Sequence, residues 1–370
     1  MRSWNNPVSL KDAYGGQAQR FARAFEVLKQ GVAESAFPGA SVAVTLREEL
    51  VALAGVGHFT YAPDSTPVDH NTIYDLASVS KVIATTTMAM MLYERRKLRL
   101  DMPVKEALPE FAGTDPIRDR VTIRMLLNHT AGLPSYLRLF EQANDRERLV
   151  QNASRAPLTA EPGTRADYSD IGFIILGELL ARTAGEPLDS FCRKEIFKPL
   201  GMRDTTYNPP MNWGQRIPPT VDDRSFRKRI VQGEVHDENA SILRGVAGHA
   251  GLFATAYDVA RFAQCLLDGG SPILKRETVE LFTTRDASVP GSYALGWDTP
   301  SAPSQSGKYF SPKSYGHLGY TGTSLWIDPE RQLSVTLLTN RTWPDRASDK
   351  IKTVRPTFHD AILEALDRND

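Results

Sequence analysis

The stretch Tyr74-Asp75-Leu76-Ala77-Ser78-Val79-Ser80-Lys81-Val82-Ile83-Ala84 places a serine and a lysine three positions apart. Apolar residues follow, and no glycine or proline interrupts the chain before Leu100, so we predict a helix with Ser78 in its first turn. Residues three apart share one helix face, which brings the Lys81 amine to the Ser78 hydroxyl and suits it to activate a nucleophile. The unpaired N–H groups and the dipole of a first turn also favour an oxyanion. The alternative is an N-capping serine with a solvated lysine, because this spacing also arises by chance.

Composition limits the classes of partner. Lys+Arg and Asp+Glu both number 44 among 370 residues, so the chain has no net positive charge to attract nucleic acid. A nucleic-acid role is therefore disfavoured. The N-terminal segment Met1–Pro7 lacks an apolar h-region, and no run approaches a membrane span. We expect a soluble chain, cytoplasmic or, if a leader has been removed, periplasmic or secreted. The sequence leaves the oligomeric state open.

Hydrophobic periodicity predicts an α+β fold. Helices are predicted at 17–34, 123–127, 171–183, 257–267 and 354–366, and strands at 40–46, 50–59, 295–297, 324–327 and 333–338, the first two paired antiparallel. This order fits an antiparallel sheet built from both ends of the chain, flanked by N- and C-terminal helices and interrupted by a mostly helical insertion. The predicted α/β domain comprises residues 1–110 and 285–370, and the helical domain residues 111–284.

Two later motifs support catalysis at Ser78. In Tyr168-Ser169-Asp170, a phenol near a lysine can be held as phenolate and serve as general base, since a cation lowers its pKa. In Gly316-His317-Leu318-Gly319-Tyr320-Thr321-Gly322-Thr323, the glycines allow a substrate close to the backbone, so the N–H groups of Tyr320 and Ser78 can form an oxyanion hole. The alternatives are a packing tyrosine and a simple β-bulge.

In this order, S-x-x-K, Y-x-[N/D] and a basic residue followed by x-Gly resemble the motifs of the penicillin-recognising serine hydrolases. The similarity is greatest to the branch that holds class C β-lactamases, D-alanyl-D-alanine carboxypeptidases and β-lactamase-like carboxylesterases. It extends from about Pro38 to Leu338 and includes the connecting segments 126–134 and 199–202.

The resemblance implies an active site in the cleft between an α/β and a helical domain. It implies that Ser78 is acylated, that Lys81 and Tyr168 share the proton transfer, and that His317 takes the place of the third motif's lysine. It implies no cofactor, and its substrates are small esters, β-lactams or amides.

The third motif departs from the family pattern. It reads His317-Leu318-Gly319 where Lys-Thr-Gly is typical, so the leucine offers no hydroxyl and a neutral imidazole offers at most one donor. An anionic substrate would lose a charge-assisted partner of about 1.5–3 kcal/mol. Asp170, standing where asparagine is usual, would further disfavour an anion and would favour a protonated Lys81.

These departures favour a carboxylesterase that acts on short neutral acyl esters through an acyl-enzyme, with weak β-lactam hydrolysis. Asp170, Leu318 and Gly319 are expected to bind substrate, with Tyr136 as a wall of the cleft. The alternatives are a β-lactamase or D-alanyl-D-alanine carboxypeptidase/D-aminopeptidase, and a non-catalytic penicillin-binding-like sensor. The presence of all the proton-handling groups argues for retained acyl transfer.

A metal site is a competing interpretation of two other segments. Residues 233–240 and 248–251 hold His236, His249 and several carboxylates in a short window. No recognised ligand spacing is present, so we favour a hydrogen-bonded loop that lines the cleft and predict no metal.

Overall fold

The computed structural model describes residues 8–113 and 115–368, so Met1–Pro7 lies outside the described part. The strands are β1 (Lys11–Asp12), β2 (Gly39–Leu46), β3 (Glu49–Gly57), β4 (Tyr74–Asp75), β5 (Thr206–Tyr207), β6 (Val221–Asp223), β7 (Arg229–Val231), β8 (Leu252–Ala254), β9 (Tyr315–Leu318), β10 (Ser324–Asp328) and β11 (Leu333–Thr339). The α-helices are α1 (Gln17–Arg20), α2 (Ala22–Ala33), α3 (Thr87–Glu94), α4 (Val104–Ala107), α5 (Ile123–Leu127), α6 (Arg146–Ser154), α7 (Asp170–Ala184), α8 (Leu188–Cys192), α9 (Lys198–Leu200), α10 (Glu238–Ile242), α11 (Ala256–Leu267), α12 (Arg276–Thr283) and α13 (Ile351–Asp367). A 3₁₀ helix, η1 (Ala77–Val79), and a π-helical segment, η2 (Lys81–Thr86), lie between β4 and α3.

The main sheet joins both ends of the chain. Its strand order is β1-β3-β2-β11-β10-β9, and all neighbours are antiparallel except β1 and β3. Alternate residues of β2, among them Val42 and Val44, pack in one core with α2 and α13, whereas Ala43 faces the other core. The predicted α+β fold, with a sheet flanked by terminal helices, is confirmed.

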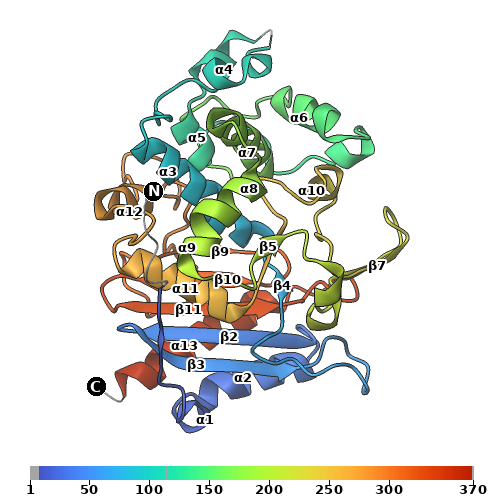
Figure 1. Cartoon of the computed structure of the whole chain (residues 1–370), viewed down its shortest axis with the longest axis vertical. Coiled ribbons are helices and arrows are strands. Elements are labelled where there is room, and N and C mark those ends of the chain that lie inside the picture. The colour runs from blue at the N-terminus through green and yellow to red at the C-terminus, as the bar shows by residue number, and fades with distance from the viewer. Residues whose placement is uncertain (1–7, 114, 369–370) are drawn as a thin grey trace.

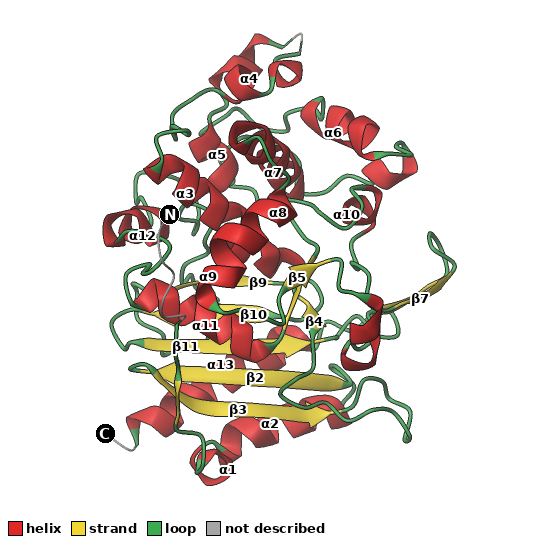
Figure 2. Ribbon diagram, viewed as in Figure 1, coloured by secondary structure: helices red, strands yellow, loops and turns green. Residues whose placement is uncertain are grey.

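Helices gather on the other side of the sheet (Figures 1 and 2). Helix α11 packs against β2 and β11, while α7 contacts both α3 and α5 farther from the sheet. Because α11 falls within the predicted insertion but lies on the sheet, the domain limits at 110 and 285 stay a prediction.

Some predicted elements differ from the structure. The strand predicted at 295–297 is wrong: only isolated bridges occur at Tyr293 and Asp298. Gly296 has φ +88°, and a Cβ there would lie 2.2 Å from Thr86 Oγ1, so the chain bends closely over η2 instead of extending. The helix that follows Ser78 ends at Glu94, before Leu100, although no glycine or proline lies between them.

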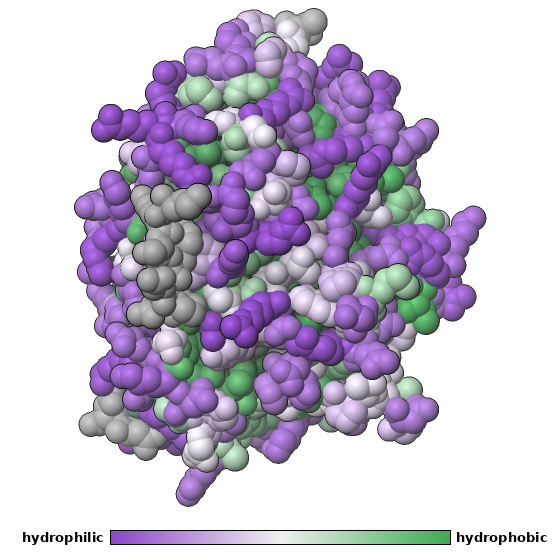
Figure 3. All heavy atoms as spheres, viewed as in Figure 1, coloured by the Kyte–Doolittle hydropathy of each residue, from purple (hydrophilic) through white to green (hydrophobic). Residues whose placement is uncertain are grey.

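Hydrophilic side chains predominate on the face drawn in Figure 3, and hydrophobic ones appear there as separate groups. Within the described part of the chain, no helix combines the length and apolar character needed to cross a membrane.

Candidate active site

The nucleophile segment is fixed between two strands and a helix. Strand β4 pairs with β8, and Leu76 N–H donates to Leu252 O at 2.9 Å. Ala77 then adopts φ +46°, a conformation that is uncommon for any residue other than glycine. Ser78 follows in η1 and is partly exposed, while Lys81 opens η2 and is fully buried. This turn of the backbone at Ala77 places the Ser78 hydroxyl at the surface and the Lys81 side chain beneath it.

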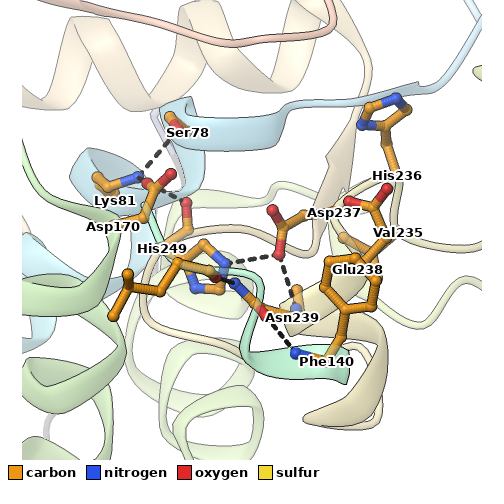
Figure 4. Close-up of polar contacts among 12 residues, drawn as sticks. Ser78, Lys81, Phe140, Asp170, Val235, His236, Asp237, Glu238, Asn239 and His249 are labelled. Atoms are coloured by element: carbon orange, nitrogen blue, oxygen red, sulfur yellow. Dashed lines mark hydrogen bonds and ion pairs between the residues drawn. The ribbon is translucent and has the colours of Figure 1, made fainter. Parts of the chain in front are cut away.

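Lys81 contacts three acceptors. Its Nζ lies 2.9 Å from Ser78 Oγ, 2.6 Å from Asp170 Oδ1 and 3.0 Å from the carbonyl oxygen of His249 (Figure 4). Burial lowers the pKa of Lys81, and the Asp170 carboxylate opposes this shift without cancelling it. The expected effect of Asp170 is therefore present, but burial outweighs it. A lowered pKa makes the neutral amine more accessible, and a neutral amine at 2.9 Å can take the Ser78 proton.

Tyr168 provides the second contact to the nucleophile. Its hydroxyl lies 2.7 Å from Ser78 Oγ and 3.2 Å from Asp170 Oδ1. Burial, followed by the Asp170 charge, raises the pKa of Tyr168 well above its ordinary value. Burial and the neighbouring carboxylate therefore disfavour the phenolate that the sequence allowed. The Tyr168 hydroxyl donates to Ser78 Oγ.

Asp170 is held at a helix start. It is the first residue of α7, and Ser169 Oγ caps this helix by accepting from Gly172 N–H at 3.0 Å. The positive end of the helix dipole stabilises a carboxylate at this position. Asp170 thereby presents one oxygen to both Lys81 and Tyr168.

The turn after β9 is tied to the backbone that leads to Ser78. Thr321 Oγ1 donates to Asp75 O and Thr323 Oγ1 to Leu76 O, both at 2.8 Å. Within the described residues, the N–H groups of Ser78 and Tyr320 donate to no other group. Both amides are thus free to bind an oxyanion, and that role stays a prediction.

His317 differs from the expected substitute for a lysine. Its Nδ1 lies 2.8 Å from Leu318 O, and because a carbonyl only accepts, Nδ1 carries the hydrogen. Burial, with the nearby Lys81 charge, lowers the pKa of His317 to about 3, so the ring is neutral. Its Nε2 then carries a lone pair and no hydrogen. His317 therefore offers the substrate neither a cation nor an N–H donor.

A cavity of about 670 Å³ gathers these groups. All the predicted site residues except Lys81 line it: Ser78, Tyr136, Tyr168, Asp170, His317, Leu318, Gly319 and Tyr320. Lys81 lies beneath Ser78, with no exposed surface.

The segments considered for metal binding form another wall. His249 Nε2 lies 2.8 Å from Asp237 Oδ1, which also accepts Ala240 N–H at the start of α10 (Figure 4). Burial acts to raise the pKa of Asp237, but His249 and the Ala240 N–H hold it below its ordinary value. The prediction of a hydrogen-bonded loop lining the cleft is confirmed. The described residues contain no group of three or more His, Cys, Asp or Glu side chains placed to hold a metal ion.

The sequence did not indicate the basic residues of this cavity. Arg341, Arg346, Lys352 and Arg355 line it from the segment after β11 and from α13. They belong to no motif, and only the packing of the C-terminal segment brings them near Ser78.

Comparison with known proteins agrees with this arrangement. The Beta-lactamase family model matches residues 24–355. An N-acetylmuramyl-L-alanine amidase of Bacillus subtilis (strain 168) is 34% identical over 342 residues, which are 82% of this chain and 77% of that protein. A putative D-alanyl-D-alanine carboxypeptidase of Escherichia coli (strain K12) is 32% identical over 301 residues, 73% of this chain and 69% of that protein.

Solved structures share the fold. EstCE1, a hydrolase with promiscuous acyltransferase activity, superposes with a TM-score of 0.76 at 24% identity over 94% of this chain and 99% of that chain. A class C beta lactamase from Rhodobacter sphaeroides gives a TM-score of 0.71 at 24% identity, with the same coverage of both chains.

Proposed function

This chain belongs to the Beta-lactamase family, a family of serine hydrolases, and on that premise we propose that it hydrolyses its substrate through an acyl-enzyme formed on Ser78. One observation carries the proposal: Ser78 Oγ lies within hydrogen-bonding distance of both Lys81 Nζ, at 2.9 Å, and Tyr168 OH, at 2.7 Å. A serine with a base on one side and an acid on the other is equipped for acyl transfer. A non-catalytic sensor would not need this arrangement.

In the proposed mechanism, Ser78 Oγ attacks the substrate carbonyl and its proton passes to the amine of Lys81, whose pKa burial lowers. The N–H groups of Ser78 and Tyr320 bind the resulting oxyanion. The Tyr168 phenol donates its proton to the leaving group, and Lys81 returns a proton to Tyr168 through Asp170 Oδ1, which contacts both side chains. Water then attacks the acyl-enzyme and releases the acid and Ser78.

The first candidate substrate is a short acyl ester, with weak β-lactam hydrolysis as a side activity. His317 and Leu318 supply neither the cation nor the hydroxyl with which the family's usual third motif holds a carboxylate. The similarity in fold to EstCE1 is consistent with this candidate.

Hydrolysis of p-nitrophenyl butyrate and of nitrocefin, each compared between the wild type and Ser78→Ala, tests this function. We expect the ester to be hydrolysed faster than nitrocefin and both activities to be lost in the variant. Efficient nitrocefin turnover without ester hydrolysis would instead assign a β-lactamase.

The second candidate is an amide hydrolase acting on cell-wall peptides. Two relatives above 30% identity carry the names of an amidase and a putative D-alanyl-D-alanine carboxypeptidase. Release of D-alanine from D-alanyl-D-alanine peptides, or of L-alanyl peptides from muramyl peptides, at a higher kcat/KM than ester hydrolysis would favour it.

A further inference from the structure

The carbonyl oxygen of His249 is one of three groups that contact the Lys81 amine (Figure 4). The other two are Ser78 Oγ, at 2.9 Å, and Asp170 Oδ1, at 2.6 Å. A carbonyl and a carboxylate only accept hydrogen bonds, so they take both hydrogens of the amine when it is uncharged. The lone pair of Lys81 then points to the Ser78 hydroxyl. The direction of the His249 carbonyl therefore affects the direction of the base.

The backbone around His249 is rich in glycine. Gly248 precedes this residue, and Gly251, with φ +114°, follows two positions later. Glycines restrict the backbone less than other residues do. Thr85 Oγ1 donates to the carbonyl of Gly248 at 2.7 Å and holds one side of the peptide. The His249 side chain is placed to hold the other side.

The His249 ring is held by one side chain. Its Nε2 lies 2.8 Å from Asp237 Oδ1, and the His249 side chain is 1% exposed. Its buried Nδ1 has no hydrogen-bond partner among the described residues. Burial acts to raise the pKa of Asp237, but His249 and the Ala240 N–H hold it below its ordinary value. Asp237 is therefore a carboxylate that accepts, and His249 Nε2 carries the hydrogen.

Asp237 belongs to a loop that is fixed on both sides (Figure 4). The N–H of His236 donates to Asp75 Oδ2 at 2.6 Å. Asn239 Oδ1 accepts the Phe140 N–H at 2.9 Å. Asp237 itself caps the start of α10. These contacts make Asp237 a rigidly held acceptor for the His249 ring.

We propose that the hydrogen bond between Asp237 and His249 positions Lys81 for catalysis. By holding the His249 carbonyl in place, this bond directs the lone pair of Lys81 toward Ser78 Oγ. Asp237 and His249 act through Lys81, so both are positioning residues. This inference rests on the proposed hydrolase function and adds two residues to its mechanism.

Two substitutions of similar length at His249 test this role. His249→Gln keeps an N–H donor near the place of Nε2, whereas His249→Met has none. We expect kcat/KM for p-nitrophenyl butyrate to fall by about 10- to 100-fold in His249→Met, the cost of a misplaced catalytic group. The glutamine variant should stay within about threefold of the wild type. Wild-type kcat/KM in His249→Met, or an equal fall in both variants, would overturn the proposal.

The pH profile gives a readout that a loss of stability would not change. Burial lowers the pKa of Lys81, while Asp170 and, more weakly, Asp237 raise it. The His249 carbonyl also favours the ammonium because it accepts a hydrogen bond. In His249→Met this acceptor is no longer held, so the acid limb of kcat/KM should move to lower pH. The other titratable groups around Lys81 are the same in this variant: Asp170, Tyr168, His129 and His317. A profile lowered by one factor at every pH would overturn the proposal.

Asp237→Ala breaks the same hydrogen bond from its other end. If the two side chains act as one unit, the double variant with His249→Met should lose no more activity than the worse single variant, within about twofold. Losses that multiply in full would show independent effects and overturn the proposal. Asp237→Ala, expected to lose about 10- to 100-fold itself, decides if His249→Met does not fold.

A buried aspartate on another helix gives the matched control. Asp258, in the first turn of α11, accepts the Asp204 N–H at 2.7 Å and the Thr205 hydroxyl at 2.9 Å. Asp258→Ala should lower the melting temperature, as Asp237→Ala does, but keep kcat/KM and its pH profile. An equal fall of kcat/KM in this control would assign the effect to stability and overturn the proposal.

The outcomes also separate this inference from the hydrolase function. A wild type that hydrolyses the ester and is labelled at Ser78, with no change in the Asp237 and His249 variants, would overturn the positioning role alone. A wild type that hydrolyses neither esters nor amides and shows no labelling of Ser78 would overturn the hydrolase function and this inference with it.

Discussion

At the scale of single residues, the site depends on how burial and charge act together. Lys81 is fully buried, so desolvation lowers its pKa although it touches the Asp170 carboxylate. The same carboxylate, together with burial, raises the pKa of Tyr168. Lys81 is therefore suited to accept a proton and Tyr168 to donate one. Asp170 contacts both groups and couples their titration.

Replacement of Tyr168 by phenylalanine tests the donor role. Tyr168→Phe removes the hydroxyl that lies 2.7 Å from Ser78 Oγ but keeps the ring. We expect kcat for ester hydrolysis to fall by about 10²–10⁴-fold, with a small change in KM, because the lost group acts on the proton of the transition state. Steady-state kinetics against the exposed control Tyr309→Phe would measure this. A variant with wild-type kcat would exclude Tyr168 from the proton transfer.

The sequence correctly predicted which side chains meet but not their ionisation. Motif order alone placed Ser78, Lys81 and Tyr168 together, and the contacts in the structure agree. The lysine charge alone allowed a Tyr168 phenolate, whereas burial and the Asp170 carboxylate raise the pKa of Tyr168. Those terms depend on packing, which a motif does not contain.

At the scale of elements, the turn between β9 and β10 positions the proposed oxyanion donor. This turn approaches η1 so closely that a Cβ on Gly319 would lie 1.9 Å from Thr323 Oγ1 and 2.5 Å from Leu76 O. The glycine therefore allows Tyr320 to lie next to the nucleophile segment. The strained backbone at Ala77, with φ +46°, is on the other side of the same contact.

Gly319→Ala should separate this turn from Ser78. Because the new methyl group meets backbone as well as a side chain, we expect a loss of stability of about 1–3 kcal/mol. The displaced Tyr320 amide should lower kcat by about 10²-fold or more. Thermal unfolding and ester kinetics measure the two effects, with Gly16→Ala as control, since nothing lies within 4 Å of a Cβ there. Wild-type kinetics in a folded Gly319→Ala variant would contradict the proposed place of the oxyanion hole.

Elements with long, regular patterns were predicted well, and short ones were not. The central strands β2, β10 and β11 lie within a few residues of the predicted strands. The strands β1, β4 and β5 have only two residues each, which is too short for a hydrophobic pattern. Their partner strands are also distant in sequence. The region around Gly296 was predicted as a strand from its apolar residues, but contact with Thr86 bends it.

At the scale of the whole molecule, α13 links the sheet core to the cavity. Its Phe358 and Ile362 pack beneath the sheet, whereas Lys352 and Arg355 line the cavity. On the same helix, His359 Nδ1 lies 3.1 Å from Ser306 O and 3.2 Å from Gln305 O. The α+β fold could be predicted from the sequence. The basic residues of the cavity could not, because their place depends on where α13 packs.

The buried His359 should make stability depend on pH. Burial, with the Arg355 charge, lowers the pKa of His359 to about 3, against an ordinary value of 6.5. Between these values the unfolded chain binds a proton that the folded chain does not, so this residue makes the wild type less stable as the pH falls. His359→Asn should reduce stability at pH 8, because hydrogen bonds are lost. The deficit should shrink by on the order of 1 kcal/mol per pH unit between pH 6 and pH 4.

Urea unfolding of the wild type and His359→Asn at pH 8, 6, 5 and 4 measures this dependence. The exposed His70→Asn serves as a surface control. Parallel stability curves for the wild type and His359→Asn would show that His359 is protonated in the folded protein near its ordinary pKa.

The central claim is that Ser78 is the residue that becomes acylated, and covalent labelling tests it most directly. A fluorophosphonate should add once to the wild type, with loss of fluoride, and peptide mass spectrometry should find the adduct on Ser78. Labelling should be absent in Ser78→Ala and much slower in Lys81→Met, because the lysine takes the serine proton. An adduct that forms equally fast in Ser78→Ala, or none at all on protein that hydrolyses esters, would contradict the account.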